Sequence, residues 1–133
     1  MKRVLFICVG NSCRSQIAEG YGNHFGGETV ICDSAGVAHS GVVHPTAIQV
    51  MAEDGIDISR HRSKGIDAMN LEEYDAIISV CSVDTDSVCP AGFMGVTERW
   101  DIPDPVYGDL DAFRRVRDML KPKVKALIER LAS

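Results

Sequence analysis

The sequence predicts an α/β protein with a single domain and a four-stranded parallel sheet flanked by helices. Short apolar runs alternate along the chain with segments whose apolar residues recur at helical spacing, which is typical of this fold class. The first run, 4–9, is continuously apolar, as a parallel strand covered on both faces must be. The chain has 133 residues, 45% of them hydrophobic, which is enough for one core, so we expect residues 1–133 to form one domain.

The first half of the chain contains two strands and two helices. After strand 4–9, a helix begins at Ser15 and ends at the glycine pair 26–27, because glycine favours helix C-termini. A second strand covers residues 29–35. The next helix begins at Pro45, because a missing N–H is tolerated in the first helical turn.

The second half contains two further strands and the longest helix. Residues 75–80 form an apolar strand that is followed directly by Cys81, and residues 96–100 form a weaker strand. A C-terminal helix is marked by an apolar stripe that consists of Phe113, Val116, Leu120, Val124, Leu127 and Leu131. Pro122 lies inside this helix and should kink or restart it, because proline cannot donate a backbone hydrogen bond.

Composition argues against two classes of partner. Fourteen Lys and Arg against nineteen Asp and Glu give a formal net charge of −5, whereas nucleic-acid binding requires a basic face. We interpret the basic residues between Arg114 and Lys125 as the solvated side of a helix. No apolar run approaches the roughly 18 residues that span a membrane. The apolar stretch at the N-terminus is too short for a signal peptide and lacks a cleavage site.

The chain contains five cysteines, which are Cys8, Cys13, Cys32, Cys81 and Cys89. An odd number without a CxxC pair does not suit a secreted disulfide scaffold. The four histidines have no metal-binding spacing with one another or with the cysteines. We therefore expect a cytoplasmic protein with reduced thiols, no metal site and no cofactor.

The strongest motif is the segment 8–15, CVGNSCRS, which lies between the first strand and the first helix. Backbone N–H groups in such a loop and in the following helical turn have no intrahelical partner, so they converge on an oxyanion. Six residues are predicted to bind this oxyanion: Val9, Gly10, Asn11, Ser12, Cys13 and Arg14.

The side chains of the motif suit nucleophilic attack on a bound oxyanion. Gly10 should let the loop turn without a Cβ clash, and Asn11 tolerates left-handed dihedral angles. Arg14 offers a planar fork for two oxygens. The loop donors favour the thiolate form of Cys8, and Ser15 can donate a hydrogen bond to that thiolate. The alternative is that Cys8 is an ordinary buried strand cysteine.

The segment 8–20, CVGNSCRSQIAEG, closely resembles the low-molecular-weight tyrosine phosphatase superfamily and, within it, the thioredoxin-coupled arsenate reductases. The resemblance continues through 34–36, 44–45 and 56–59 and covers nearly the whole chain. Gln16 is one discriminator, because the phosphatases typically carry proline after Cys-Arg-Ser and the reductases carry glutamine.

Asp104 is the candidate general acid. Attack on arsenate or on a phosphate ester requires a proton for the departing oxygen. Asp104 lies between Pro103 and Pro105, which stiffen the loop. In the resembled family the aspartate before proline is the general acid, which corresponds to Asp104. Asp101 is a weaker rival, and the alternative for both residues is a simple turn.

Cys81 and Cys89 separate reduction from hydrolysis. Reduction of arsenate requires two electrons, which thiols can supply, whereas a phosphatase hydrolyses its intermediate with water. The resemblance implies that Cys8 forms an arsenate adduct, that Cys81 attacks Cys8 and releases arsenite, and that Cys89 then attacks Cys81. The segment 82–88 is polar and suited to movement. The resulting disulfide would be reduced by thioredoxin or by glutaredoxin and glutathione.

Other interpretations stay open at this stage. Seven residues separate Cys81 from Cys89, one more than the resemblance leads us to expect, which leaves the reductant undecided. The runner-up function is a low-molecular-weight tyrosine phosphatase, supported by Tyr107, because these phosphatases stack an aromatic pair after Asp-Pro on phosphotyrosine. A third interpretation is a non-enzymatic sensor of oxyanions or redox state. We interpret Cys13 and Cys32 chiefly as packing residues.

The resemblance also extends to residues that form a potassium site in some relatives. Some relatives bind potassium through residues that correspond to Asn11, Glu19 and Ser34 and through an aspartate. The residue at the position of that aspartate is Lys64 in this chain. A lysine there replaces a ligand of a cation by a cation, which argues against a metal site.

Overall fold

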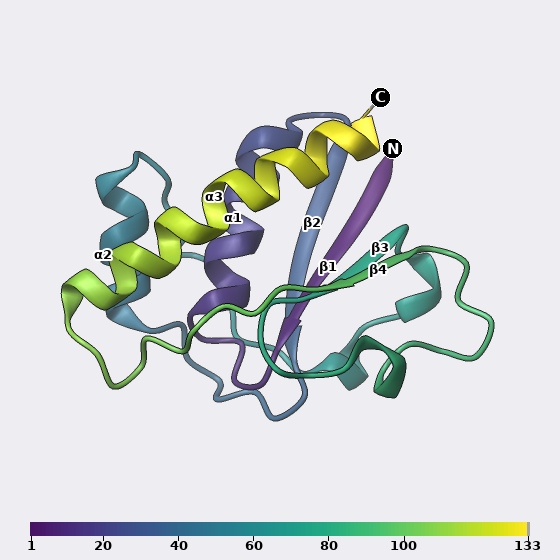
Figure 1. The fold of residues 1–133 in the computed structure, drawn as a ribbon, viewed down its shortest axis with the longest axis horizontal. Coiled ribbons are helices and arrows are strands. Elements are labelled where there is room, and N and C mark those ends of the chain that lie inside the picture. Colours follow the sequence, from purple (N-terminus) through teal and green to yellow (C-terminus); the bar gives the residue numbers. More distant parts are fainter. Residues whose placement is uncertain (133) are drawn as a thin grey trace.

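The four strands form one parallel sheet, as predicted, in the order β2-β1-β3-β4 (Figure 1). The computed structural model describes residues 1–132, and its strands are β1 (Lys2–Cys8), β2 (Val30–Gly36), β3 (Ala76–Ser79) and β4 (Val96–Arg99). β1 pairs with β2 on one side and with β3 on the other. Because the strands are parallel, their carboxyl ends meet at one edge of the sheet, where Cys8 ends β1.

The two faces of the sheet are covered differently. On one face lie three α-helices, α1 (Arg14–Gly26), α2 (Pro45–Glu53) and α3 (Leu110–Ala132). The other face is covered by loops and by three 3₁₀ helices, η1 (Ile66–Ala68), η2 (Leu71–Glu73) and η3 (Thr85–Ser87). Among residues 1–132, no helix combines the length and apolar character needed to cross a membrane.

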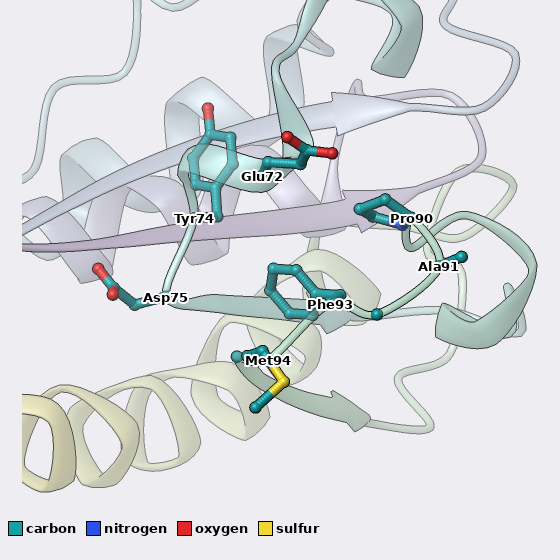
Figure 2. Close-up of a pocket in the computed structure, with 9 residues that line it drawn as sticks. Glu72, Tyr74, Asp75, Pro90, Ala91, Phe93 and Met94 are labelled. Atoms are coloured by element: carbon teal, nitrogen blue, oxygen red, sulfur yellow. The ribbon is translucent and has the colours of Figure 1, made fainter.

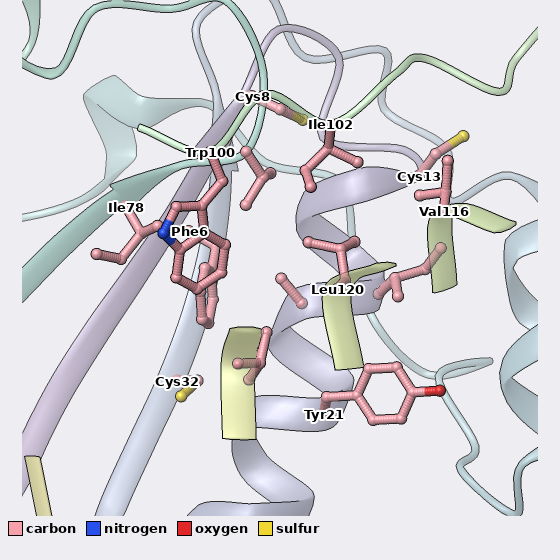
Figure 3. Close-up of a cluster of buried hydrophobic side chains, with 14 of the residues drawn as sticks. Phe6, Cys8, Cys13, Tyr21, Cys32, Ile78, Trp100, Ile102, Val116 and Leu120 are labelled. Atoms are coloured by element: carbon pink, nitrogen blue, oxygen red, sulfur yellow. The ribbon is translucent and has the colours of Figure 1, made fainter. Parts of the chain in front are cut away.

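Each face of the sheet has its own hydrophobic cluster. Phe6 and Cys8 of β1 belong to the large cluster under the α-helices, which also contains Cys32 (Figure 3). Leu5 and Ile7 point to the other face and belong to a smaller cluster. All four β1 residues are at most 3% exposed. The continuous apolar run therefore reflects burial of both faces of this strand.

α3 continues through Pro122, so the expected restart of the helix is wrong. Pro122 lies on the exposed side of the helix, whereas Leu120 and Val124 on either side of it are fully buried. Burial of this apolar stripe outweighs the backbone hydrogen bond that proline cannot donate, because tertiary packing supplies most helix stability in proteins.

Replacing Pro122 by alanine should raise the free energy of unfolding by about 1 to 3 kcal/mol, because alanine restores a helical N–H donor. Urea denaturation followed by circular dichroism measures this change. Glu129→Ala, on the exposed side of the same helix, is the matched control and should change the free energy by less than about 0.5 kcal/mol. An unchanged or lower free energy for Pro122→Ala would show that α3 needs the proline geometry.

Candidate active site

The loop between β1 and α1 packs tightly against the end of β2. A Cβ atom added to Gly36, the last residue of β2, would lie 2.5 Å from the carbonyl oxygen of Val9 and 3.1 Å from the backbone nitrogen of Asn11. Gly10 was expected to be needed for steric reasons, and this expectation is wrong. A Cβ atom there would meet only the Ser12 hydroxyl, at an ordinary 3.6 Å. The close approach that requires glycine is at Gly36.

Asn11 holds the loop in shape. It is fully buried, and among residues 1–132 it is the one non-glycine residue with positive φ, 49°. Its backbone N–H donates to Cys8 Sγ at 3.2 Å. The prediction that Asn11 closes the loop with left-handed dihedral angles is confirmed.

The hydroxyl of Ser15 lies within hydrogen-bond distance of the sulfur of Cys8. The backbone N–H of Lys64 donates to Asn11 Oδ1 at 2.8 Å, so the other end of this amide is the NH₂ group. Asn11 Nδ2 donates to Ser15 Oγ at 2.8 Å. Ser15 accepts this bond, and its own proton can be donated to Cys8 Sγ, 2.9 Å away. A thiolate has no proton to donate, so towards a Cys8 thiolate Ser15 would be the donor and would stabilise the charge.

Arg14 forms one wall of a cavity of about 210 Å³ above Cys8. Its Nη1 donates to the carbonyl oxygen of Ile102 at 2.9 Å, and its Nη2 lies 3.8 Å from Asp104 Oδ2. Arg14 thus links the oxyanion loop to the loop that carries the candidate acid. Five of the six predicted anion-binding residues line the cavity, and Asn11, whose backbone N–H is directed to Cys8 Sγ, does not. The lining consists of Cys8, Val9, Gly10, Ser12, Cys13, Arg14, Asp104 and Val106.

Asp104 lies at the mouth of this cavity, with its side chain 52% exposed. Its Oδ1 accepts a hydrogen bond from the backbone N–H of Val106 at 3.0 Å. A carboxyl group in this position can reach both a bound oxyanion and bulk water, as an acid that is reprotonated between turnovers requires. Asp101, the rival candidate, does not line the cavity: its side chain is 87% exposed, and its Oδ1 lies 4.0 Å from Arg99 Nε. The geometry favours Asp104.

Cys81 lies at the same edge and on the same face of the sheet as Cys8. All five cysteines are free thiols. The backbone N–H of Val80 donates to the carbonyl oxygen of Ile7 at 3.0 Å, so Cys81 follows β3 directly beside the end of β1. Cys81 is buried, belongs to the large cluster that contains Cys8, and its sulfur accepts from the N–H of Val83 at 3.4 Å.

Cys89 lies elsewhere. Its half-buried side chain packs against the smaller cluster on the opposite face of the sheet. Burial and the nearby carboxylate of Asp86 raise the pKa of the Cys89 thiol. The segment that follows, 90–95, borders two surface hollows of about 430 and 290 Å³, the larger of which is drawn in Figure 2. In this structure, Cys89 is therefore a protonated thiol separated from Cys81, beside a segment with open space on two sides.

The remaining two cysteines are poor nucleophiles. Burial raises the pKa of Cys13 to about 11 and that of Cys32 to about 12. Both are therefore protonated near neutral pH. Cys13 nevertheless lines the cavity, whereas Cys32 lies inside the large cluster.

The ammonium group of Lys64 lies next to the carboxylate of Glu19, near the oxyanion loop. Lys64 Nζ is 3.5 Å from Glu19 Oε1, and Ser34 donates to the same carboxylate oxygen at 2.6 Å. No group of three or more His, Cys, Asp and Glu side chains within the described residues is arranged to hold a metal ion.

Sequence reasoning did not find the support beneath the loop. The fully buried amide of Gln16 donates to both oxygens of Asn11, at 3.0 and 3.1 Å. The segment 61–64 supplies backbone groups to the same loop, including the N–H of Lys64. The one signal in the sequence for the role of Gln16 was the position of this polar residue beside Ile17, at the start of a buried helix. The segment 61–64 has no periodicity that could reveal its partners.

Known proteins share this architecture over almost the whole chain. The family described as low molecular weight phosphotyrosine protein phosphatase matches residues 3–133. The chain belongs to this family. It is 39% identical over 132 residues to a glutaredoxin arsenate reductase of Synechocystis sp., covering 99% of this chain and 100% of that protein. It is 43% identical to arsenate reductase 1 of Staphylococcus epidermidis, with 98% of each chain covered.

Solved structures point to the same family. An arsenate reductase in the phosphate binding state superposes with a TM-score of 0.89 at 40% identity, covering 98% of this chain and 99% of the other. A low molecular weight protein tyrosine phosphatase from T. tengcongensis superposes with a TM-score of 0.87 at 27% identity, with 98% and 99% covered. Reductase and phosphatase members thus share one backbone, so the side chains around Cys8 must distinguish the two activities.

Replacing Gly36 by alanine should weaken the binding of inorganic phosphate by at least about tenfold, because the new Cβ displaces the carbonyl of Val9 and with it the anion-binding N–H groups. Isothermal titration calorimetry measures this affinity. Val37→Ala changes an exposed neighbouring side chain and is expected to bind phosphate like the wild type. Wild-type affinity in Gly36→Ala would show that the loop does not depend on this contact.

Proposed function

We propose that this protein reduces arsenate to arsenite with electrons from a thiol reductant, through a relay of Cys8, Cys81 and Cys89. One observation carries the proposal: Cys8 lies at the base of an oxyanion-binding loop, and a second cysteine, Cys81, follows the neighbouring strand on the same face. The names of the relatives at 39 and 43% identity support it.

The first step is attack of the Cys8 thiolate on arsenic. The oxyanion is held by Arg14 and by the loop N–H groups of residues 9–14, which stabilise the charge that develops on its oxygens. A sulfur–arsenic bond forms and an arsenic–oxygen bond breaks. Asp104 supplies the proton with which the oxygen leaves as water.

The second step transfers the electrons. The sulfur of Cys81 attacks the sulfur of Cys8, the electron pair of the sulfur–arsenic bond moves to arsenic, and the proton of the Cys81 thiol passes to an oxygen of the departing arsenite. Arsenic(V) thereby becomes arsenic(III) and leaves as arsenite, while Cys8 and Cys81 form a disulfide. Their adjacent positions at the ends of β1 and β3 suit this step.

The third step requires movement. Cys89 has to leave the opposite face of the sheet to attack Cys81, which releases Cys8 and forms a Cys81–Cys89 disulfide. Departure from its packed position also removes the burial that raises its pKa, so movement and activation of this thiol coincide. Solved relatives include arsenate reductases in reduced and oxidized states.

An external dithiol then reduces this disulfide. Thioredoxin and a glutaredoxin–glutathione system are the two candidates, and one relative carries the name glutaredoxin arsenate reductase. After this reduction Cys81 and Cys89 are free thiols again, and they stay so only in a reducing compartment. The cytoplasm is therefore the proposed location.

Phosphotyrosine hydrolysis is the second candidate function. Tyr107 is fully exposed and follows Val106, which lines the cavity, so its ring is available to an aromatic substrate. In that reaction water, instead of Cys81, would attack the adduct on Cys8, and no further thiol would be used.

Substituting serine for single cysteines should separate these functions. Cys8→Ser is expected to abolish arsenate turnover, whereas Cys81→Ser and Cys89→Ser should each reduce it by at least about a hundredfold, because serine cannot continue disulfide exchange. The assay couples arsenate to thioredoxin and its reductase, and in parallel to glutaredoxin and glutathione. Cys32→Ser is the control outside the relay and should retain activity. Full turnover by both Cys81→Ser and Cys89→Ser would exclude the relay.

Asp104→Asn should lower the rate of adduct formation by about 10²- to 10⁴-fold, because the amide cannot deliver a proton. Rapid-quench measurement of arsenite release in a single turnover tests this step. Phosphate affinity should fall little, since anion binding depends on Arg14 and the loop. Asp101→Asn is the matched control. If Asp101→Asn shows the loss and Asp104→Asn does not, the acid has been assigned to the wrong residue.

A further inference from the structure

The imidazole of His61 lies outside the residues that line the cavity, yet a continuous chain of hydrogen bonds joins it to Cys8. We propose that His61 is a positioning residue: it orients the amide of Gln16, and this amide holds Asn11 in the conformation that the oxyanion loop requires. The proposal deepens the proposed function and rests on it only for the reaction that the loop serves.

The backbone N–H of Lys64 fixes the orientation of the Asn11 and Gln16 amides, because a peptide nitrogen only donates. It lies 2.8 Å from Asn11 Oδ1, which must therefore be the amide oxygen. The Gln16 atom 3.0 Å from that oxygen must then be the amide nitrogen. The same nitrogen lies 3.0 Å from the carbonyl oxygen of Arg62. Gln16 consequently points its oxygen away from the loop.

His61 meets this oxygen. Its Nδ1 lies 3.0 Å from Gln16 Oε1, and since an amide oxygen only accepts, Nδ1 carries the proton and donates it. On the other side of the ring, Nε2 lies 3.4 Å from Glu19 Oε2. The carboxylate of Glu19 is held in turn by Ser34, at 2.6 Å. The imidazole thus lies between the Gln16 amide and the Glu19 carboxylate, with Nδ1 presented to Gln16.

The hydrogen bond that His61 donates to Gln16 matters because the side chain of Gln16 is fully buried. Without His61, the amide oxygen loses the donor that the structure places there, and rotation of the amide becomes less costly. A rotated amide would turn its oxygen towards the oxygens of Asn11. Asn11 already has a φ of 49°, a value that residues other than glycine seldom adopt, so it needs these contacts. Its backbone N–H faces the Cys8 sulfur, so the disturbance reaches the reacting atom.

Two measurements on the full chain test the proposal. His61→Ala should weaken binding of inorganic phosphate, and slow alkylation of Cys8 by iodoacetamide, by about tenfold each. His61→Asn carries an amide nitrogen close to the position of Nδ1, so it should restore both to within about twofold of wild type. His24→Ala, an exposed histidine near the end of α1, is the control and should match wild type. Calorimetry gives the affinity, and peptide mass spectrometry gives the alkylation of Cys8.

Either of two results overturns the proposal. One is wild-type affinity and alkylation in His61→Ala; the other is a His61→Asn variant as impaired as His61→Ala, which would assign the effect to the ring and not to its donor. Should thermal melting show His61→Ala to be unfolded, His61→Phe replaces it, because phenylalanine fills the ring volume without a donor. Wild-type behaviour of His61→Phe likewise overturns the proposal. Neither readout involves arsenate reduction, Cys81 or Cys89, so failure of the proposed function is distinguishable.

Discussion

The hydrogen bond from the backbone N–H of Lys64 to the side chain of Asn11 is the contact on which the active-site arrangement depends. Asn11 is buried with a positive φ, an arrangement that is stable only where its surroundings hold it. The bond fixes which end of the amide is the oxygen. The amide nitrogen then donates to the hydroxyl of Ser15, which lies 2.9 Å from Cys8 Sγ. A residue far away in the sequence therefore fixes the orientation of the amide that contacts Ser15.

The two faces of the sheet are covered differently, and this difference separates the cysteines. Cys8 and Cys81 belong to the large cluster under the α-helices, while Cys89 packs on the face that loops and 3₁₀ helices cover. Loops with few buried contacts open more readily than packed helices. In the proposed relay, the thiol that has to move therefore lies on the face that can rearrange locally, while the oxyanion loop stays anchored to β1 and α1. The same separation would keep Cys89 from forming a disulfide before Cys81 has reacted.

Local chemistry in the sequence predicted the strands and the loop that carries Cys8, because each depends on residues adjacent in the chain, and it named Asp104 as the candidate acid. β1 is readable from its continuous apolar run, and the left-handed residue from the polar Asn11 between a strand and a helix. The steric need for glycine was placed at Gly10 and lies instead at Gly36. That error and the missed role of Gln16 have one cause: both depend on contacts between segments that no periodicity links. The restart expected at Pro122 does not occur, because the buried residues on either side of it keep the helix continuous.

The oxyanion loop alone does not select between reduction and hydrolysis. Attack of Cys8 on arsenate and on a phosphate ester needs the same N–H groups, the same arginine and the same acid, and reductase and phosphatase relatives share the backbone. The activities diverge only after the adduct has formed, when either water or a second thiol approaches. At the end of β3 this chain places Cys81, beside Cys8 and already buried with it in one apolar cluster. In the proposed relay, Cys81 would compete with water from a buried position next to Cys8, and the residue that follows β3 would therefore direct the Cys8 adduct towards electron transfer.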